Sequence, residues 1–389
     1  MQRETVQEQL AKMDLDGWLL YDFQGLNPIA RKLVGLRGNL LTRRWFYWIP
    51  RIGEPAIVCH RIEQHEFQSL DGRLHPFKSW DDMIRILKEV LQGATTIAME
   101  YSPNGSIPYV SRIDGGTLEM VRNLGTRVIS SADLVQYFEA RWSRAQFQMH
   151  LEASRSLMRI LEATFEKVKA SLGVGCGVTE YELQQFMLER YVEEGLFTFS
   201  APIVAANQNS GNPHYEPSRE NSLPIRKGHF LLVDFWAKLK KPEAVYADYT
   251  WVAFLDEVIP DRYLAIWEIV RGARDAASAF VKSRYPKDPP QGWEVDSIAR
   301  KFIQQKGYGE FFIHRTGHNI GEEDHGNGAN MDSLETKDER LLLPHTCFSI
   351  EPGIYLPEFG IRSEINVYLD DDAVVITGEP VQQEVVRIY

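Results

Sequence analysis

The chain has 389 residues, of which 44% are hydrophobic and 25% charged, as is usual for a globular protein of roughly two or three domains. Its 54 acidic and 43 basic residues give a formal net charge of −11. Proteins that bind nucleic acid phosphates or anionic lipid normally carry the opposite sign, so we expect no nucleic acid partner and no membrane partner.

The sequence also lacks the marks of export and of a disulfide framework. No window of about eighteen apolar residues predicts a membrane span, and the first residues do not have the layout of a signal peptide. The cysteines, Cys59, Cys176 and Cys347, are too few and too scattered for a disulfide framework or a cysteine-rich zinc site. We expect buried or incidental thiols in a cytoplasmic protein.

The first part of the chain alternates short strands and helices. A first strand is expected at 17–22, and the apolar runs at 44–49 and 56–59 flank a turn rich in proline, which predicts a hairpin. A helical period of apolar residues follows Ser79, a typical N-cap. Further strands are expected at 96–100 and 127–129. This pattern is typical of an α/β domain, and it contains no visible catalytic cluster.

The second part begins with helices and continues with strands. A long amphipathic helix is expected from about residue 144 to 171, and the glycine-rich segment 172–177 ends it. Thr179 begins another helix with a capping-box pattern. From about residue 200 onward, long apolar strands contain isolated acids and histidines. This mismatch indicates where the function lies.

Two aspartates stand in the middle of apolar strands. Asp234 lies in the run 230–237 and Asp248 in the run 244–252. If these runs form a hairpin, both carboxylates can point to one face, where they repel each other unless they share a proton or a cation. The alternative is that each acid meets an arginine or caps a turn.

Two glutamates and a histidine repeat this pattern near the C-terminus. Glu351 is expected at the end of a strand within 346–355, and Glu364 inside another strand at 360–368. His318 lies between the two pairs of acids, in a glycine-containing segment that is not expected to be helical. Carboxylates with one imidazole suit one or two divalent ions such as Mn²⁺, Co²⁺ or Zn²⁺ rather than a structural zinc. Pairs of such ions recur in hydrolases.

The motifs around these residues resemble those of the pita-bread metallopeptidases, peptidase family M24. The family pattern, in order, is an Asp on one strand, Asp-x-Thr, Thr-Gly-His-x-x-Gly, Glu-Pro-Gly and Arg-x-Glu. The chain shows it as Asp234, Asp248 with Thr250, 316–321, 351–353 and 362–364. The resemblance covers about 150 to 389 and is strongest to the Xaa-Pro dipeptidase (prolidase) and Xaa-Pro aminopeptidase branch.

The resemblance implies an α/β (α+β) protein of two domains. Residues 1–145 would form an N-terminal α/β domain of the creatinase and prolidase type. Residues 146–389 would form a pita-bread catalytic domain with a curved antiparallel sheet. Homodimers are common in this branch, so a homodimer is expected.

The resemblance also implies a metal site. Two divalent ions per chain are expected, with Mn²⁺ favoured over Co²⁺ or Zn²⁺. Asp248 and Glu364 would bridge the two ions. The implied ligands are Asp234, Asp248, His318, Glu351 and Glu364.

Further residues match family positions around the substrate. Glu351 would relay a proton, His325 would stabilise the tetrahedral intermediate, and His214 would contact the substrate near the scissile bond. His314 would border the substrate pocket. Arg362 and Tyr355 match positions beside the carboxylate ligands, on the substrate side.

The implied activity is hydrolysis of the peptide bond before proline in Xaa-Pro dipeptides by a metal-activated bridging hydroxide. The alternatives are an Xaa-Pro aminopeptidase that acts on longer peptides and a silent pseudo-peptidase that binds peptides. Three departures from the family pattern affect the choice: Trp251, Arg315 and Gly326. Arg315 would either narrow the pocket or bind a substrate carboxylate, and the sequence leaves both open.

Overall fold

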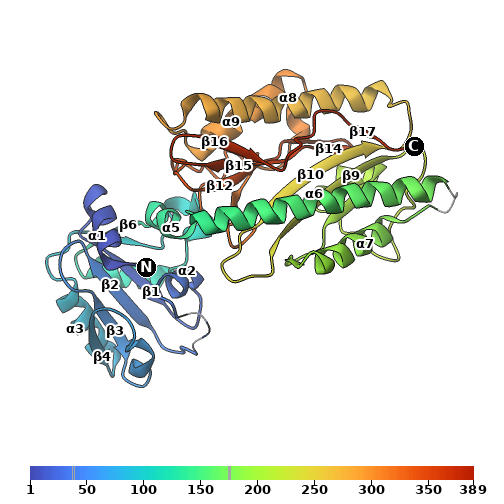
Figure 1. The fold of residues 1–389 in the computed structure, drawn as a ribbon. Coiled ribbons are helices and arrows are strands. Elements are labelled where there is room, and N and C mark those ends of the chain that lie inside the picture. The colour runs from blue at the N-terminus through green and yellow to red at the C-terminus, as the bar shows by residue number, and fades with distance from the viewer. Residues whose placement is uncertain (37, 39, 174–176) are drawn as a thin grey trace. The chain divides into compact units, whose positions relative to one another are not determined.

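A computed structural model describes residues 1–36, 38, 40–173 and 177–389. The chain divides into two units, Met1–Glu139 and Ala140–Tyr389 (Figure 1). The domain boundary predicted at residue 145 falls in the first turn of helix α6 (Arg144–Gly173). The prediction for Cys176 lies outside the described residues.

The first unit is built on a mixed six-stranded sheet with the strand order β4-β3-β2-β1-β5-β6. The strands are β1 (Gly17–Asp22), β2 (Trp45–Pro50), β3 (Ala56–His60), β4 (Arg73–Phe77), β5 (Thr96–Met99) and β6 (Arg127–Ser130). The helices are α1 (Arg3–Lys12), α2 (Pro28–Leu33), α3 (Trp80–Val90), α4 (Gly115–Asn123) and α5 (Ala132–Glu139). The predicted hairpin is confirmed as the antiparallel pair β2 and β3.

Strand β1 shows how helices cover both faces of this sheet. All of its residues are buried. Trp18 and Leu20 pack in one apolar cluster with residues of α1 and α2, whereas Leu19 and Tyr21 pack in another with residues of α3. Alternate residues of a strand point to opposite faces, so both faces are buried, as is usual when a sheet contains parallel strands.

The described residues of the second unit form three sheets and four long helices. Its helices are α6, α7 (Glu180–Glu193), α8 (Asp261–Arg284) and α9 (Gly292–Gln305). One sheet has the order β17-β10-β9-β7, with β8 also paired to β9; the others are β11-β12-β15-β16 and β13-β14. The strands are β7 (Leu196–Phe197), β8 (Ile203–Ala206), β9 (Phe230–Leu239), β10 (Ala247–Phe254), β11 (Asn319–Ile320), β12 (Cys347–Ile350), β13 (Gly353–Tyr355), β14 (Gly360–Arg362), β15 (Ile365–Leu369), β16 (Val374–Thr377) and β17 (Val386–Arg387).

Helices α6 and α7 lie on one side of these strands, and α8 and α9 on the other (Figure 1). Two apolar clusters match this arrangement, one with side chains of α6 and α7 and one with side chains of α8 and α9. On β9, Leu231, Val233 and Phe235 belong to the first cluster, and Phe230 and Leu232 to the second. The even-numbered residues of β9 therefore face the interior between the sheets.

The predicted hairpin of the two aspartates is confirmed. β9 and β10 are antiparallel, with Thr250 opposite Asp234 and Asp248 opposite Trp236. Asp234, Asp248 and Thr250 consequently share the inner face of the hairpin.

The prediction of Glu364 inside a continuous strand is wrong. β14 ends at Arg362, β15 begins at Ile365, and Glu364 lies in the break between them. The opposite chain is interrupted as well, between β12 and β13, where Pro352 has no amide hydrogen to continue the ladder. β14 therefore pairs with β13, and β15 pairs with β12.

Two expectations from composition can be compared with this fold. None of the described helices is long and apolar enough to cross a membrane. Cys59 and Cys347 are buried free thiols, and burial raises the pKa of each.

Candidate functional site

The β9–β10 hairpin supplies two buried acids and a hydroxyl. Asp234 is 8% exposed, Asp248 4% and Thr250 fully buried. Thr250 Oγ1 lies 3.0 Å from Asp234 Oδ1 and 2.9 Å from Glu364 Oε2. A hydroxyl has one hydrogen, so it can donate to only one of these carboxylates at a time. The acids therefore outnumber the donors around them.

Asn366 of β15 fixes the backbone of Asp248. Its Oδ1 accepts a hydrogen bond from Asp248 N at 2.9 Å, and its Nδ2 donates to Asp248 O at 2.7 Å. This pair of bonds joins the two main sheets of the second unit and leaves the Asp248 carboxylate free to face the interior. Asp248 Oδ1 is buried and has no hydrogen-bond partner among the described residues.

His318 and Glu351 are positioned by Ser349 of β12. Ser349 Oγ accepts a hydrogen bond from His318 N at 2.9 Å and donates to Glu351 Oε1 at 3.1 Å. Gly317 allows this close approach, because a Cβ atom there would lie 1.9 Å from Ser349 O. The glycine of the Thr-Gly-His motif is thus a packing requirement.

The ring of His318 is oriented by a backbone carbonyl. Nδ1 lies 3.1 Å from Asp324 O, which can only accept, so the hydrogen of the neutral ring lies on Nδ1. Nε2 is then an acceptor, and it lies 3.4 Å from both Asp248 Oδ2 and Glu351 Oε1. This is the usual way in which a metal-binding histidine is held.

The electrostatics of the site are those of acids without enough counter-charge. Burial raises the pKa of Asp248 and of Glu364 well above the usual value, and neighbouring acids raise both further. Burial raises the pKa of Glu351 to about 7. Burial raises the pKa of Asp234 too, although the Arg362 guanidinium opposes this rise. Burial lowers the pKa of His318 well below the usual value, so this ring is neutral.

These residues fit a divalent metal centre. Ligand atoms of Asp248, His318 and Glu364 lie within 4.8 Å of one another. Asp248 Oδ1 and Glu364 Oε1 are buried oxygens with no hydrogen-bond partner in the part of the chain that the structure describes. A cation of the Mn²⁺, Co²⁺ or Zn²⁺ type would satisfy such oxygens and remove the repulsion between them.

Three of the predicted substrate-side residues form one hydrogen-bonded chain. His314 Nε2 lies 2.7 Å from Tyr355 Oη, which accepts a hydrogen bond from Arg362 Nη1 at 2.9 Å. Arg362 also bonds Asp234 through Nη2 and donates to Thr250 Oγ1 through Nε at 2.9 Å. In this structure Arg362 therefore holds Asp234 in place, and Tyr355 holds Arg362.

The other three predicted residues differ in exposure. His214 is exposed, the His325 side chain is 57% exposed and Arg315 is buried. The His325 ring lies 4.2 Å from the His318 ring between centroids. Partial burial, with the positive charges of Arg315 and His214, lowers the pKa of His325 to about 4. The buried acids are thus accompanied by two imidazoles that are accessible to solvent.

Comparison with protein families identifies the family. Residues 150–371 match metallopeptidase family M24. The chain belongs to this family. Membership implies divalent metal ions. That Asp234, Asp248, His318, Glu351 and Glu364 hold them stays a prediction.

The relatives agree with this assignment. An Xaa-Pro dipeptidase of Lactobacillus helveticus is 30% identical over 247 residues, covering 59% of this chain and 62% of that protein. An Xaa-Pro dipeptidase of Lactobacillus delbrueckii subsp. lactis is 35% identical over 197 residues, 48% of each chain. The chain therefore spans less than two thirds of the length of these curated relatives.

A solved structure extends the likeness to the whole fold. The dipeptidase PepE of Mycobacterium ulcerans superposes with a TM-score of 0.72 at 23% identity, covering 99% of this chain and 96% of that chain. The predicted architecture, an N-terminal α/β domain followed by a pita-bread domain, is confirmed.

Several residues of this M24 site were not found from the sequence. Ser349 and Asn366 act through the backbone of a predicted ligand, and nothing in the local sequence marks them. Glu180 follows the N-cap Thr179 of α7, and its buried carboxylate accepts hydrogen bonds from Ala206 N at 2.6 Å and Tyr215 Oη at 2.7 Å. It thereby holds the segment that carries His214. Asp324 belongs to an acidic run that normally indicates a solvated loop.

Proposed function

We propose that this M24 protein is a metal-dependent peptidase that hydrolyses the bond before proline in Xaa-Pro dipeptides. The observation that carries the proposal is the group of buried acids around His318, two of which have oxygens without a hydrogen-bond donor within the described structure. The names of the two Lactobacillus relatives support proline as the residue after the scissile bond.

The proposed cofactor is a pair of divalent ions, with Mn²⁺ favoured. The proposed ligands are Asp234, Asp248, His318, Glu351 and Glu364. When bound, such ions supply Lewis acidity towards a water molecule and the scissile carbonyl. The chain itself fixes the geometry, because Thr250, Arg362, Ser349 and Asn366 each hold one or more of these ligands through the hydrogen bonds described above.

The proton transfers can be assigned to residues of the chain. Near neutral pH, Glu351 can accept a proton from the attacking water and pass it to the leaving nitrogen. His325 is neutral at that pH because its pKa is lowered to about 4, so one ring nitrogen can donate to the carbonyl oxygen as it gains negative charge. His214 approaches the substrate from the exposed side of the site.

The decisive test is proline release from the dipeptide Ala-Pro. Protein stripped with a chelator and reloaded with Mn²⁺ should release proline, and an Asp248→Asn variant treated in the same way should release none. The structure of the variant is checked by circular dichroism. Failure of the Mn²⁺-loaded protein to hydrolyse Ala-Pro contradicts a dipeptidase.

The tripeptide Ala-Pro-Ala separates the two peptidase activities. Release of alanine from this peptide, without turnover of Ala-Pro, would assign the protein as an Xaa-Pro aminopeptidase. Binding of either peptide without turnover would assign a pseudo-peptidase. Arg315→Ala tests the dipeptide preference further: if Arg315 binds the substrate carboxylate, the KM for Ala-Pro rises while kcat changes little.

The proposal includes a homodimer in the cytoplasm. Multi-angle light scattering gives the mass of the protein in solution, and a monomeric mass contradicts the dimer. Fractionation of cells that produce the full chain tests the location.

A further inference from the structure

Asp324 is a buried acid beside the site, outside the five residues proposed as ligands. It follows strand β11, and it is 4% exposed although Glu323 next to it is exposed. Its Oδ1 atom has no hydrogen-bond partner in the described ranges. A buried carboxylate oxygen in this state is unfavourable unless a cation or a proton compensates it.

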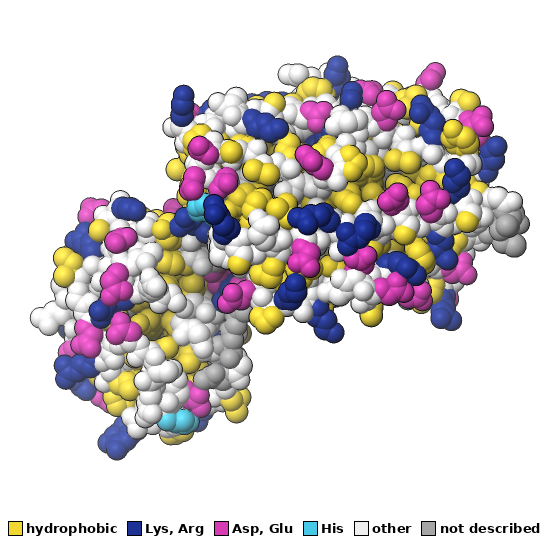
Figure 2. All heavy atoms as spheres, in the orientation of Figure 1, with side chains coloured by type: hydrophobic (Ala, Val, Ile, Leu, Met, Phe, Trp, Pro, Cys, Tyr) yellow, Lys and Arg dark blue, Asp and Glu magenta, His cyan; other side chains and the backbone are white. Residues whose placement is uncertain are grey.

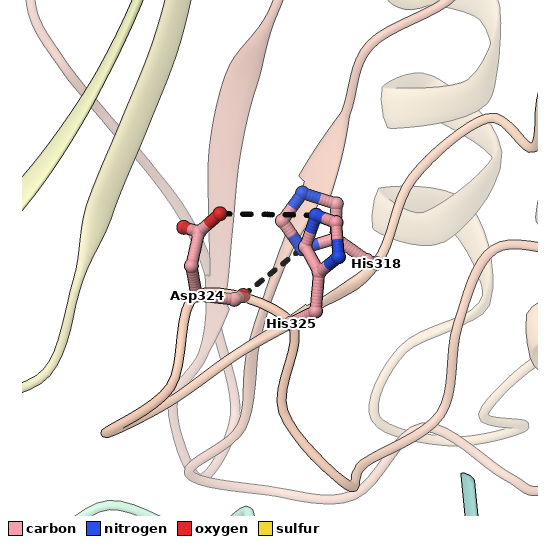
Figure 3. A group of neighbouring side chains, drawn as sticks. All are labelled: His318, Asp324 and His325. Atoms are coloured by element: carbon pink, nitrogen blue, oxygen red, sulfur yellow. Dashed lines mark hydrogen bonds and ion pairs between the residues drawn. The ribbon is translucent and has the colours of Figure 1, made fainter. Parts of the chain in front are cut away.

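The Asp324 carboxylate points towards two imidazole rings, those of His318 and His325 (Figure 3). Asp324 Oδ2 lies 3.7 Å from His325 Nε2, which is too long for a direct hydrogen bond. Ligand atoms of Asp324, His318 and His325 all lie within 4.8 Å of one another. One carboxylate and two imidazoles at this spacing are a donor set for a divalent ion.

Asp324 shares its electrostatic surroundings with the proposed ligands. Burial raises the pKa of Asp324 well above the usual value, and the charges of Asp234 and Glu351 raise it further. Burial and Glu364 raise the pKa of Asp248, and Asp324 adds to that rise. The carboxylate therefore faces the same group of acids and adds one more negative charge to it.

Arg315 gives an alternative explanation for this buried acid. Its positive charge acts on Asp324, and also on Glu351 and His318. An acid that only balanced Arg315 would not need an oxygen without a hydrogen-bond partner. Asp324 Oδ1 is such an oxygen, while Oδ2 of the same carboxylate is the oxygen that faces the histidines (Figure 3).

We propose that Asp324 is an additional carboxylate ligand of the metal centre, on the His318 side. His318 Nδ1 is occupied by the carbonyl of Asp324, so Nε2 is the nitrogen available to both groups of ligands. The ion bound by Asp324 is therefore the one bound by His318. An added carboxylate favours hard ions such as Mn²⁺ over Zn²⁺. This inference rests on the proposed metal centre.

Calorimetric titration with Mn²⁺ tests the inference. In chelator-stripped protein, Asp324→Asn should weaken binding of one ion by about tenfold or more, as loss of a group from a metal site does. Glu323→Gln is the matched control: it removes the same charge from the neighbouring exposed position and should leave the affinity within about twofold. Asp324→Ser replaces Asp324→Asn if circular dichroism shows that the latter is unfolded.

Co²⁺-substituted protein distinguishes a direct ligand from a distant charge. The visible d–d absorption of Co²⁺ reports its ligands, so Asp324→Asn should change the spectrum and Glu323→Gln should not. Unchanged Mn²⁺ affinity and an unchanged Co²⁺ spectrum in the Asp324 variants, with Mn²⁺ binding lost in Asp248→Asn, would overturn the inference alone. Absence of Mn²⁺ binding in the unmodified protein would overturn the metal centre as a whole.

Discussion

Each unit of the molecule buries carboxylates, and Glu100 of the first unit differs from the acids around His318 in the second. In the first unit, Glu100 is fully buried and accepts hydrogen bonds from Trp18 Nε1 at 2.7 Å, Asn27 Nδ2 at 2.8 Å and Ser131 Oγ at 3.1 Å. In the second unit, Asp248 and Glu364 each have a buried oxygen without a donor in the described structure, and other acids lie beside them.

The difference separates a structural acid from a functional one. Burial raises the pKa of Glu100 to about 7 and that of Glu351 to about 7, so a raised pKa does not distinguish them. The number of hydrogen-bond donors around each carboxylate does distinguish them. Glu100 has three side-chain donors from three parts of its unit. The acids around His318 have the hydroxyls of Thr250 and Ser349 and the guanidinium of Arg362, and Asp248 Oδ1 and Glu364 Oε1 have no donor among the described residues. Such a deficit is what a metal ion compensates.

The largest expected effect is in the second unit. Glu364→Gln should abolish Mn²⁺ binding and peptidase activity, because it removes a proposed ligand that two ions would share. The stripped variant should melt at the same temperature as the stripped protein or higher, because one of several repelling acids is gone. Normal turnover in a fully metal-loaded variant would remove Glu364 from the site.

In the first unit the opposite result is expected. Glu100→Ala should lower the free energy of unfolding by about 3 kcal/mol, since it leaves buried donors of Trp18, Asn27 and Ser131 without an acceptor. Chemical denaturation measures this change, and Mn²⁺ affinity should not change. Glu89→Ala, which breaks only an exposed ion pair with Arg85, is the control and should stay within about 0.5 kcal/mol.

A smaller effect is expected in the pH dependence of stability, to which buried acids of both units contribute. Because the folded-state pKa values of Glu351 and Glu100 are raised to about 7, the folded protein binds more protons than the unfolded chain. The contribution of these two glutamates to stability is lost as the pH rises from the ordinary value of about 4.5 through about 7 and is gone above that, so stripped protein should lose stability most clearly between about 6.5 and about 7.5. Buried neutral histidines such as His150, whose pKa burial lowers to about 4, act in the opposite direction only below about 6.5.

Bound Mn²⁺ should remove only part of this fall in stability with rising pH. Mn²⁺ holds the acids of the second unit ionised, so the melting temperature of loaded protein should keep the contribution of Glu100 alone. Combining Mn²⁺ with Glu100→Gln should flatten the profile over that range. A slope that Mn²⁺ does not alter would show that the acids of the second unit are not metal-bound.

The smallest effect is expected from a residue that positions ligands. Ser349→Ala removes the acceptor for His318 N and the donor to Glu351, and should weaken Mn²⁺ binding by about tenfold while activity at saturating Mn²⁺ persists. Titration calorimetry measures the affinity. Affinity equal to that of the unmodified protein would mean that the backbone near Gly317 alone holds His318.

The sequence predicted those parts of the site that follow from periodicity. Alternation along two apolar runs placed Asp234 and Asp248 on one face, and the structure agrees. It could not predict the break before Glu364, because that depends on Pro352 in the opposite strand. The burial of Asp324 could not be predicted either, because tertiary packing alone turns this one acid of an acidic run towards the interior.

The two hydrogen bonds between the Asn366 side chain and the Asp248 backbone have a consequence for when the protein can bind its metal. The two residues are 118 positions apart, and the last proposed ligands, Glu351 and Glu364, lie close to Asn366 in the chain. During synthesis the hairpin with the two aspartates is completed long before β15 exists to fix it. Contacts so distant in sequence form late in folding. In the proposed metal centre, metal capture would therefore be a final step of maturation, and the ion would then join the last strands to the first.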